Sequence, residues 1–283
     1  MQRMNKFILV AILTILIIAM INNVTNTNHK LSALPYSTTP PPNSVIPWEP
    51  PSLLQLYREY DEAHLFDHWE EYAPHYDVHL RKLFEKIPET KEFRMLEIGV
   101  QSGGSVRVWK NYFSDRKFYY VGMDIDPACK RSEVPSENIF VEIGDQSDPR
   151  TLKKICREHG PFDFIVDDGG HKYEQIKASL DTLFPSDECL NHDSLYGIED
   201  LHVMAMGKDY SQNPGDVPSL PGYVFKKMHY HWYKQYKAGQ NESDKVWADR
   251  IGSLILYNSM MFIERGNGEG MLTRIMKGDD RIP

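Results

Sequence analysis

The sequence predicts an α/β protein with a doubly wound, mostly parallel sheet that ends in an antiparallel C-terminal hairpin. Three observations predict this fold. Short apolar runs alternate with stretches whose apolar residues recur every three or four positions, which is the strand–helix pattern. Several of the runs end in a carboxylate or a glycine turn, as strands do at the carboxyl edge of an open sheet. The last two runs are separated by a short turn, which favours a hairpin.

Five strands of βα type are expected before the antiparallel pair. They cover residues 94–100, 118–124, 138–143, 162–168 and 194–200, and the hairpin covers 253–257 and 260–264. The expected helices cover residues 52–87, 106–113, 149–159, 171–183 and 223–236. Asp148 followed by Pro149 is a helix-start signal, and Gly160 with Pro161 ends that helix. His171 is expected to be the first residue of the helix at 171–183.

The composition suits one catalytic domain with appendages. The chain has 283 residues, of which 41% are hydrophobic and 25% are charged, enough for a sizeable core. Its net charge of -8 argues against a nucleic-acid partner, because such proteins carry basic patches. Cys129, Cys156 and Cys189 allow at most one disulfide. Three free cysteines in the core are the favoured interpretation.

The amino-terminal segment predicts a membrane tether. Residues 7–21 are apolar apart from Thr14, and Arg3 and Lys6 precede them. As a helix they would span about 22 Å, less than the ~30 Å hydrocarbon core of a bilayer. We expect a cytoplasmic tail at 1–6, a signal anchor at 7–21 and a single-pass type II protein of the Golgi or ER membrane with a lumenal catalytic domain. Secretion after signal cleavage is the alternative.

A proline-rich stretch separates this tether from the rest of the chain. Prolines recur among Ser, Thr and Asn through residues 22–52, which therefore cannot pack a core. This stretch is expected to be a semi-rigid stem, and residues 53–283 are expected to form the catalytic domain.

Three strand ends predict a cofactor that contains a nucleoside. The glycine turn at 101–105 lets backbone N–H groups approach a ligand closely. Asp124 ends the second strand, where a carboxylate typically accepts from the two ribose hydroxyls. Asp145 and Gln146 follow the third strand, where they could reach an adenine. A solvated strand-end acid is the alternative for Asp124.

These motifs resemble, in their order, the class I S-adenosylmethionine-dependent methyltransferases. The resemblance rests on Leu96-Glu97-Ile98-Gly99 with Gly103, on Gly122-Met123-Asp124 and on Gly144-Asp145-Gln146. Two further motifs, Asp167-Asp168-Gly169-Gly170-His171 and Ile198-Glu199-Asp200, resemble those of the metal-dependent sugar O-methyltransferases of macrolide tailoring, the mycinamicin and tylosin type. The resemblance covers about residues 60–266. Gly170 departs from it, because the group usually has Ser there.

The resemblance implies a Rossmann-like methyltransferase sheet, S-adenosylmethionine as cofactor and a sugar or glycan acceptor, here in the secretory pathway. The implied cofactor-binding residues are Glu97, Gly99, Gly103, Asp124, Asp145, Gln146 and Asp167. Asp167 would face the cofactor side.

The carboxylates at two adjacent strand ends predict a metal centre. Asp168, Glu199 and Asp200 would suit a hard cation, Mg²⁺ or Mn²⁺, with positions open for substrate oxygens. A sugar hydroxyl is a poor nucleophile, so it needs such a cation and a base. His171 is the expected general base. Its place at a helix start should favour the neutral imidazole.

Two other functions fit parts of the sequence. A lumenal metal-dependent glycosyltransferase would share the anchor, the stem and the acidic metal site. A non-catalytic binding protein could use the same fold. Residues 64–69 mix histidines with aromatic and acidic residues, so they could cover an active site or belong to a covering helix. His229 and His231 look like a metal pair, but positions i and i+2 of a helix do not share a face. A homo-oligomer is left open.

Overall fold

The computed structural model describes residues 50–203, 219–234, 246–247 and 249–266, all within the unit Trp48–Pro283. The predicted tail and anchor lie outside the described residues, as does the predicted stem apart from its last three positions. Among the helices that the structure describes, none has the length and apolar character needed to cross a bilayer.

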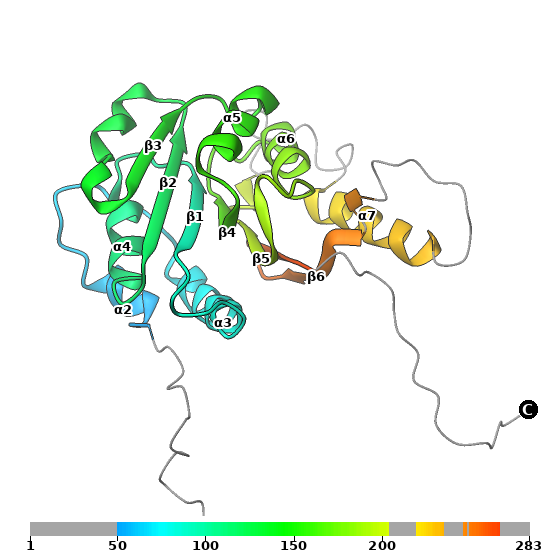
Figure 1. Ribbon diagram of the computed structural model, residues 1–283, viewed down its shortest axis with the longest axis horizontal. Coiled ribbons are helices and arrows are strands. Elements are labelled where there is room, and N and C mark those ends of the chain that lie inside the picture. Colours follow the sequence, from blue (N-terminus) through cyan, green and yellow to red (C-terminus); the bar gives the residue numbers. More distant parts are fainter. Residues whose placement is uncertain (1–49, 204–218, 235–245, 248, 267–283) are drawn as a thin grey trace, which may run out of the picture. The chain divides into compact units, whose positions relative to one another are not determined.

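A seven-stranded sheet forms the centre of this unit, in the order β3-β2-β1-β4-β5-β7-β6 (Figure 1). The strands are β1 (Phe93–Ile98), β2 (Phe118–Asp124), β3 (Ile139–Ile143), β4 (Phe162–Asp167), β5 (Leu190–Ile198), β6 (Ile251–Leu256) and β7 (Met261–Arg265). The first five are parallel, whereas β7 runs antiparallel to both β5 and β6. The predicted fold class is therefore confirmed.

Helices cover both faces of the sheet. They are α2 (Leu53–Arg58), α3 (Ala73–Phe84), α4 (Gly104–Tyr112), α5 (Pro149–His159), α6 (Tyr173–Leu183) and α7 (Leu220–Lys234), with short 3-10 turns η1 (Glu70–Tyr72), η2 (Pro127–Ser132) and η3 (Pro135–Glu137). The cap predicted for α5 is confirmed, because the Asp148 side chain accepts from the backbone N–H of Arg150. Its carboxylate satisfies a donor that the helix leaves free.

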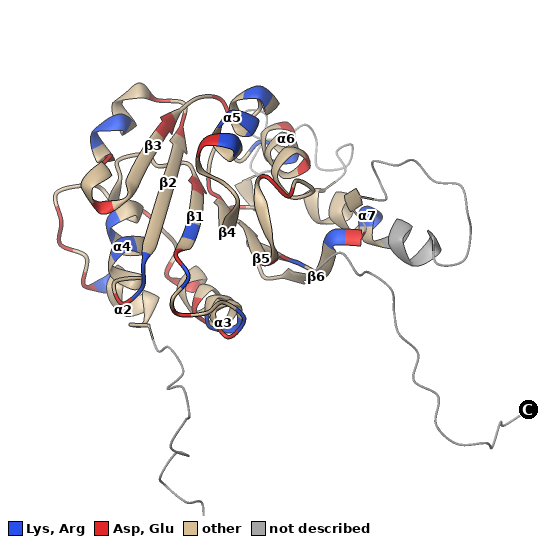
Figure 2. Ribbon diagram, viewed as in Figure 1, with Lys and Arg blue, Asp and Glu red and all other residues tan. Residues whose placement is uncertain are grey.

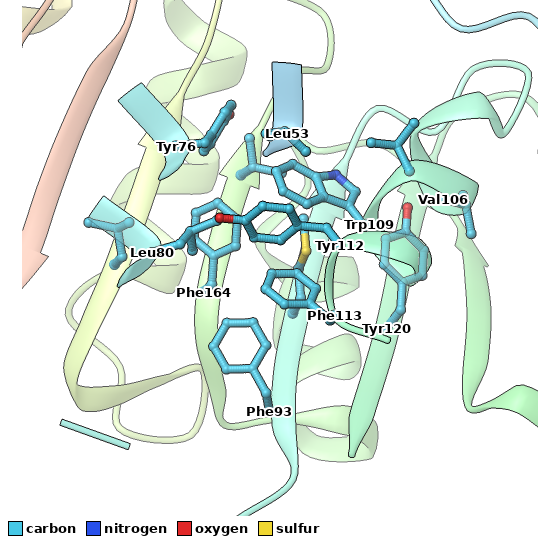
Figure 3. Packing of buried hydrophobic residues seen from close by; sticks show 14 of the residues in the cluster. Leu53, Tyr76, Leu80, Phe93, Val106, Trp109, Tyr112, Phe113, Tyr120 and Phe164 are labelled. Atoms are coloured by element: carbon cyan, nitrogen blue, oxygen red, sulfur yellow. The ribbon is translucent and has the colours of Figure 1, made fainter. Parts of the chain in front are cut away.

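Alternation along the strands produces two apolar cores. Met95 of β1 packs with α2, α3 and α4 on one face, whereas the next residue, Leu96, packs with α5, α6 and α7 on the other. Figure 3 shows the first core, in which Trp109, Tyr112 and Phe113 pack near strand residues such as Phe164. Aromatic side chains dominate this face, and they hold α3 and α4 against the sheet.

Two predicted helix boundaries were wrong. Residues 52–87 are not one helix, because the segment 59–69 between α2 and η1 contains no helix. This segment lacks a regular apolar repeat. His171 does not open α6, which begins at Tyr173, and its φ of 52° is left-handed. The turn after Gly170 runs through His171, so this residue precedes the first turn of α6.

Charges of both signs are interspersed along the described helices (Figure 2). On α5, Lys154 lies 2.9 Å from a carboxylate oxygen of Glu142 and 3.2 Å from one of Glu158. Such exposed pairs contribute little to stability, but they neutralise local fields.

One disulfide joins Cys156 of α5 to Cys189, the residue before β5. Cys129 is free and buried. The favoured interpretation of three free cysteines was therefore wrong. The backbone N–H of Phe162 donates to the carbonyl of Cys189, which places Cys189 beside the end of α5. This long-range pairing cannot be read from the spacing of the cysteines.

Reducing the disulfide should lower the free energy of unfolding by roughly 2–4 kcal/mol, because the bridge closes a long loop in the unfolded chain. Urea unfolding with and without reductant measures this change. In the double variant Cys156→Ala/Cys189→Ala the reductant should have no effect, whereas in Cys129→Ser its effect should persist. Equal midpoints for the oxidised and reduced wild-type protein would contradict the expectation.

Candidate active site

A cavity of about 740 Å³ opens at the carboxyl ends of the parallel strands. The predicted site residues that line it are Gly99, Asp124, Asp145, Gln146, Asp168, His171, Glu199 and Asp200. Three others, Glu97, Gly103 and Asp167, do not line it. The cavity extends over β1 and β4, where the strand order reverses, as expected for a ligand site in an open α/β sheet.

Gly99 allows the two halves of the cavity to meet. Its φ is +96°, and a Cβ atom there would lie 2.1 Å from the carbonyl oxygen of Asp168. The backbone N–H of Asp168 also donates to the carbonyl of Ile98 at 2.9 Å. A side chain at position 99 would therefore push Asp168 away from the end of β1.

Asp124 holds the glycine turn from below. One carboxylate oxygen, Oδ2, accepts from the backbone N–H groups of Val100 and Gln101 at 2.9 and 2.8 Å. The other, Oδ1, accepts from Asp126 at 2.9 Å. Asp124 thus fixes the turn that borders the cavity. Asp145 also lines the cavity, and it accepts from the backbone N–H and the hydroxyl of Ser147.

Glu97 lies under α4, outside the cavity lining. Its carboxylate accepts from Ser105 Oγ at 2.9 Å, from Trp109 Nε1 at 3.0 Å and from the hydroxyl of Tyr120. Burial raises the pKa of Glu97 despite these donors. Gly103 has a φ of +87° and is the residue before α4. Both residues therefore lie at α4 and do not line the cavity.

Asp167 is also buried beneath the cavity. It accepts from Gln146 Nε2 at 3.0 Å and from the hydroxyl of Ser179, and burial raises its pKa. Gln146 Oε1 in turn accepts from the backbone N–H of Gly170 at 2.7 Å. Asp167 therefore orients Gln146 and, through it, the turn that carries His171.

The three predicted metal ligands come together around Asp168. Its carboxylate forms one potential metal-binding group with His68 and Glu199 and another with His171 and Asp200, with the ligand atoms in each group within 4.8 Å of one another. Burial and the charges of Glu199 and Asp200 raise the pKa of Asp168 well above its usual value. The His171 Nε2 atom lies 3.9 Å from Asp200 Oδ2.

Three residues at this cluster were not predicted as site residues. Tyr76 donates to Glu199 Oε1 at 2.5 Å, and Tyr72 donates to Asp200 Oδ1 at 2.7 Å. His68 Nδ1 lies 3.5 Å from Glu199 Oε2 and 4.0 Å from Asp168 Oδ2. Burial alone would lower the pKa of His68, but the hydrogen bond and charge of Glu199, with smaller effects of Glu97 and Asp200, raise it.

The segment 59–69 brings His68 to the cluster. A Cβ atom at Gly104 would lie 2.3 Å from the carbonyl oxygen of Leu65, so the segment rests directly on the start of α4. It then continues into η1 and α3, which carry Tyr72 and Tyr76 four positions apart. That spacing on one helical face, together with the histidine–aromatic mixture before it, was the available signal. The segment lines the cavity, which supports the first of its two interpretations.

No family model matches the chain. Among curated proteins, the chain is 34% identical over 215 residues to demethylmacrocin O-methyltransferase of Streptomyces fradiae, a match covering 72% of this chain and 50% of the relative. It is 31% identical over 232 residues to mycinamicin VI 2''-O-methyltransferase of Micromonospora griseorubida, covering 78% and 54%. The chain thus spans about half the length of these relatives.

Among solved structures, the chain is similar to MycE methyltransferase from the mycinamycin biosynthetic pathway. In the complex with Mg, SAH and mycinamycin VI, the TM-score is 0.61 at 28% identity, covering 78% of this chain and 55% of that one. In a crystal form with Mg and SAH the TM-score is 0.64, with coverage of 82% and 58%. These comparisons support the predicted enzyme class and both predicted cofactors. They give no support to a glycosyltransferase.

The predicted location in a Golgi or ER membrane was wrong. The relatives are biosynthetic enzymes of Streptomyces and Micromonospora, which are bacteria and lack both organelles. The predicted anchor and the secretory-pathway glycan receive no support from these relatives. The side chains of His229 and His231 lie outside the described part of the chain, so the expectation that they do not form a metal pair stays a prediction.

By sheet topology and by sequence similarity, the chain therefore has the class I methyltransferase fold and is a relative of the sugar O-methyltransferases of macrolide biosynthesis.

Proposed function

We propose that the chain is an O-methyltransferase that uses S-adenosylmethionine and a divalent cation to methylate a sugar hydroxyl of a glycoside. The observation that carries the proposal is one cavity lined both by the strand-end residues Asp124, Asp145 and Gln146 and by an acidic cluster with a histidine. The relatives include 2'- and 3'-O-methyltransferases of rhamnosyl tetracenomycins, which supports a sugar hydroxyl as the acceptor.

The cofactor would occupy the side over β1, β2 and β3. Backbone N–H groups of the turn that begins at Gly99 would approach the polar end of the cofactor, because Gly99 itself carries no side chain. Asp124 would accept from a ribose hydroxyl with the remaining lone pair of Oδ1. Asp145 and Gln146 would lie along the adenine. In this proposal Glu97, Gly103 and Asp167 act as supports of these groups.

The residues of the acidic cluster fit a hard divalent cation. Carboxylates dominate the set, and Mg²⁺ and Mn²⁺ prefer oxygen ligands. Burial and the charges of Glu199 and Asp200 raise the pKa of Asp168, and a bound cation would offset this repulsion. Asp168, Glu199 and Asp200 would hold the cation, with Tyr76 and Tyr72 orienting the last two. When bound, the cation would stabilise negative charge on the acceptor oxygen.

His171 would take the proton from the acceptor hydroxyl. Its Nε2 atom is near Asp200, so a hydroxyl held at the cluster would be within its reach. The left-handed backbone at His171 and the hydrogen bond that Gly170 donates to Gln146 fix the turn that carries His171.

Trp69 could contribute to acceptor binding. It lines the cavity, is 53% exposed and contacts His202 edge-on, so its open face could stack on a sugar ring.

Methyl transfer should depend on His171. Incubation with labelled S-adenosylmethionine and a panel of glycosides should yield methylated product with the wild-type chain. His171→Ala should lower kcat by about 10²- to 10⁴-fold, the usual contribution of a general base. The matched control is His192→Ala, an exposed histidine near the start of β5. Mass spectrometry of the products measures both. A variant His171→Ala that is as active as the control would contradict the assigned base.

Cation binding should depend on Asp168. Isothermal titration with Mn²⁺ should show one site that EDTA removes and that Asp168→Asn abolishes, because Asp168 belongs to both groups of ligands. Glu158→Gln is the matched control. Glu158 also belongs to a cluster of acids and a histidine, but Lys154 already neutralises it. The assignment would be wrong if Glu158→Gln abolished binding or Asp168→Asn left it intact.

A further inference from the structure

We propose that His68 is a nitrogen ligand of the cation, so that the centre has mixed nitrogen and oxygen ligands and prefers Mn²⁺ to Mg²⁺. The inference rests on the proposed cation site. It adds a ligand from the segment 59–69, which neither the strand-end motifs nor the names of the relatives indicate.

The distances fit direct coordination. Two ligands about 2.2 Å from one metal lie about 3.1 Å apart in neighbouring octahedral positions and about 4.4 Å apart in opposite ones. His68 Nδ1 lies 3.5 Å from Glu199 Oε2 and 4.0 Å from Asp168 Oδ2, between these limits. A cation among the three atoms would therefore require only small shifts of the side chains.

The ring of His68 is held in this orientation by its neighbours. Its side chain is 8% exposed. Phe66 stacks on it with the ring centroids 4.8 Å apart, and Tyr57 of α2 lies 5.8 Å away. Gly104 allows the segment to rest on α4. Turning the imidazole away from the acids would break these aromatic contacts, so the nitrogen is already in place for a ligand.

The chemistry of the donor set favours Mn²⁺. Mg²⁺ is usually bound by oxygen atoms and water, whereas imidazole is a common ligand of transition metals. A neutral imidazole also adds a donor without adding a fourth negative charge. His171 remains free to accept a proton, because its group with Asp168 and Asp200 does not include His68.

The competing role for His68 is that of a counter-ion. A protonated imidazole would balance the acids without a cation and would be displaced when the cation binds. The two roles predict opposite effects of removing the imidazole. As a ligand, His68 increases Mn²⁺ affinity, whereas as a counter-ion it competes with Mn²⁺.

Pulsed electron paramagnetic resonance of the full chain loaded with Mn²⁺ tests the proposal. The wild-type spectrum should contain echo modulation from a directly bound nitrogen. His68→Ala should remove this modulation and weaken Mn²⁺ binding by at least about 10-fold, with less than about 3-fold change for Mg²⁺. His171→Ala is the matched control and should keep the modulation. An unchanged thermal midpoint shows that each variant is folded.

The outcomes separate the inference from the proposed function. Bound Mn²⁺ without nitrogen modulation, or tighter binding by His68→Ala, would overturn the role of His68 and leave the function intact. Nitrogen modulation without methyl transfer to any glycoside would support His68 and contradict the function. A wild-type chain that binds Mg²⁺ but no Mn²⁺ would contradict the inference alone, and one that binds neither cation would contradict both.

Discussion

Repulsion among the carboxylates at the ends of β4 and β5 is the constraint on which the site depends. The two strands are parallel neighbours, and the backbone N–H of Glu199 donates to the carbonyl of Asp167, so the acids cannot separate. Two charges about 4 Å apart interact by roughly 4 kcal/mol near a protein surface. That is a large part of a typical folding free energy of about 5–15 kcal/mol. The cluster must therefore bind protons or a cation.

The surrounding structure can be understood as a response to this constraint. Tyr72 and Tyr76 donate hydrogen bonds to Asp200 and Glu199. The Nδ1 atom of His68 also lies close to the Glu199 carboxylate. Gly99 lets Asp168 lie against the end of β1, which joins the acidic cluster to the cofactor side of the cavity. In the proposed reaction, rigid strand ends would hold both the methyl donor and the sugar hydroxyl. Such positioning lowers the barrier to a bimolecular reaction.

The sequence was sufficient for the fold and for the acids, because carboxyl ends of parallel strands meet at one edge of the sheet. It could not show which motif residues line the cavity. Asp167 and Asp168 are adjacent, but successive side chains of a strand point in opposite directions, and only Asp168 reaches the cavity. The sequence also could not show which residues contact the acids. Tyr76 and Tyr72 are 123 and 128 positions away from the acids to which they donate. His68 belongs to a segment without regular periodicity.

Anomalous X-ray diffraction from crystals grown with Mn²⁺ would test the central claim most directly. The account predicts an anomalous peak among the carboxylates of Asp168, Glu199 and Asp200, within bonding distance of all three. A fully loaded crystal with its peak elsewhere, for example at Glu142 and Glu158, would contradict it, and so would an acidic cluster that remains without a cation at saturating Mn²⁺.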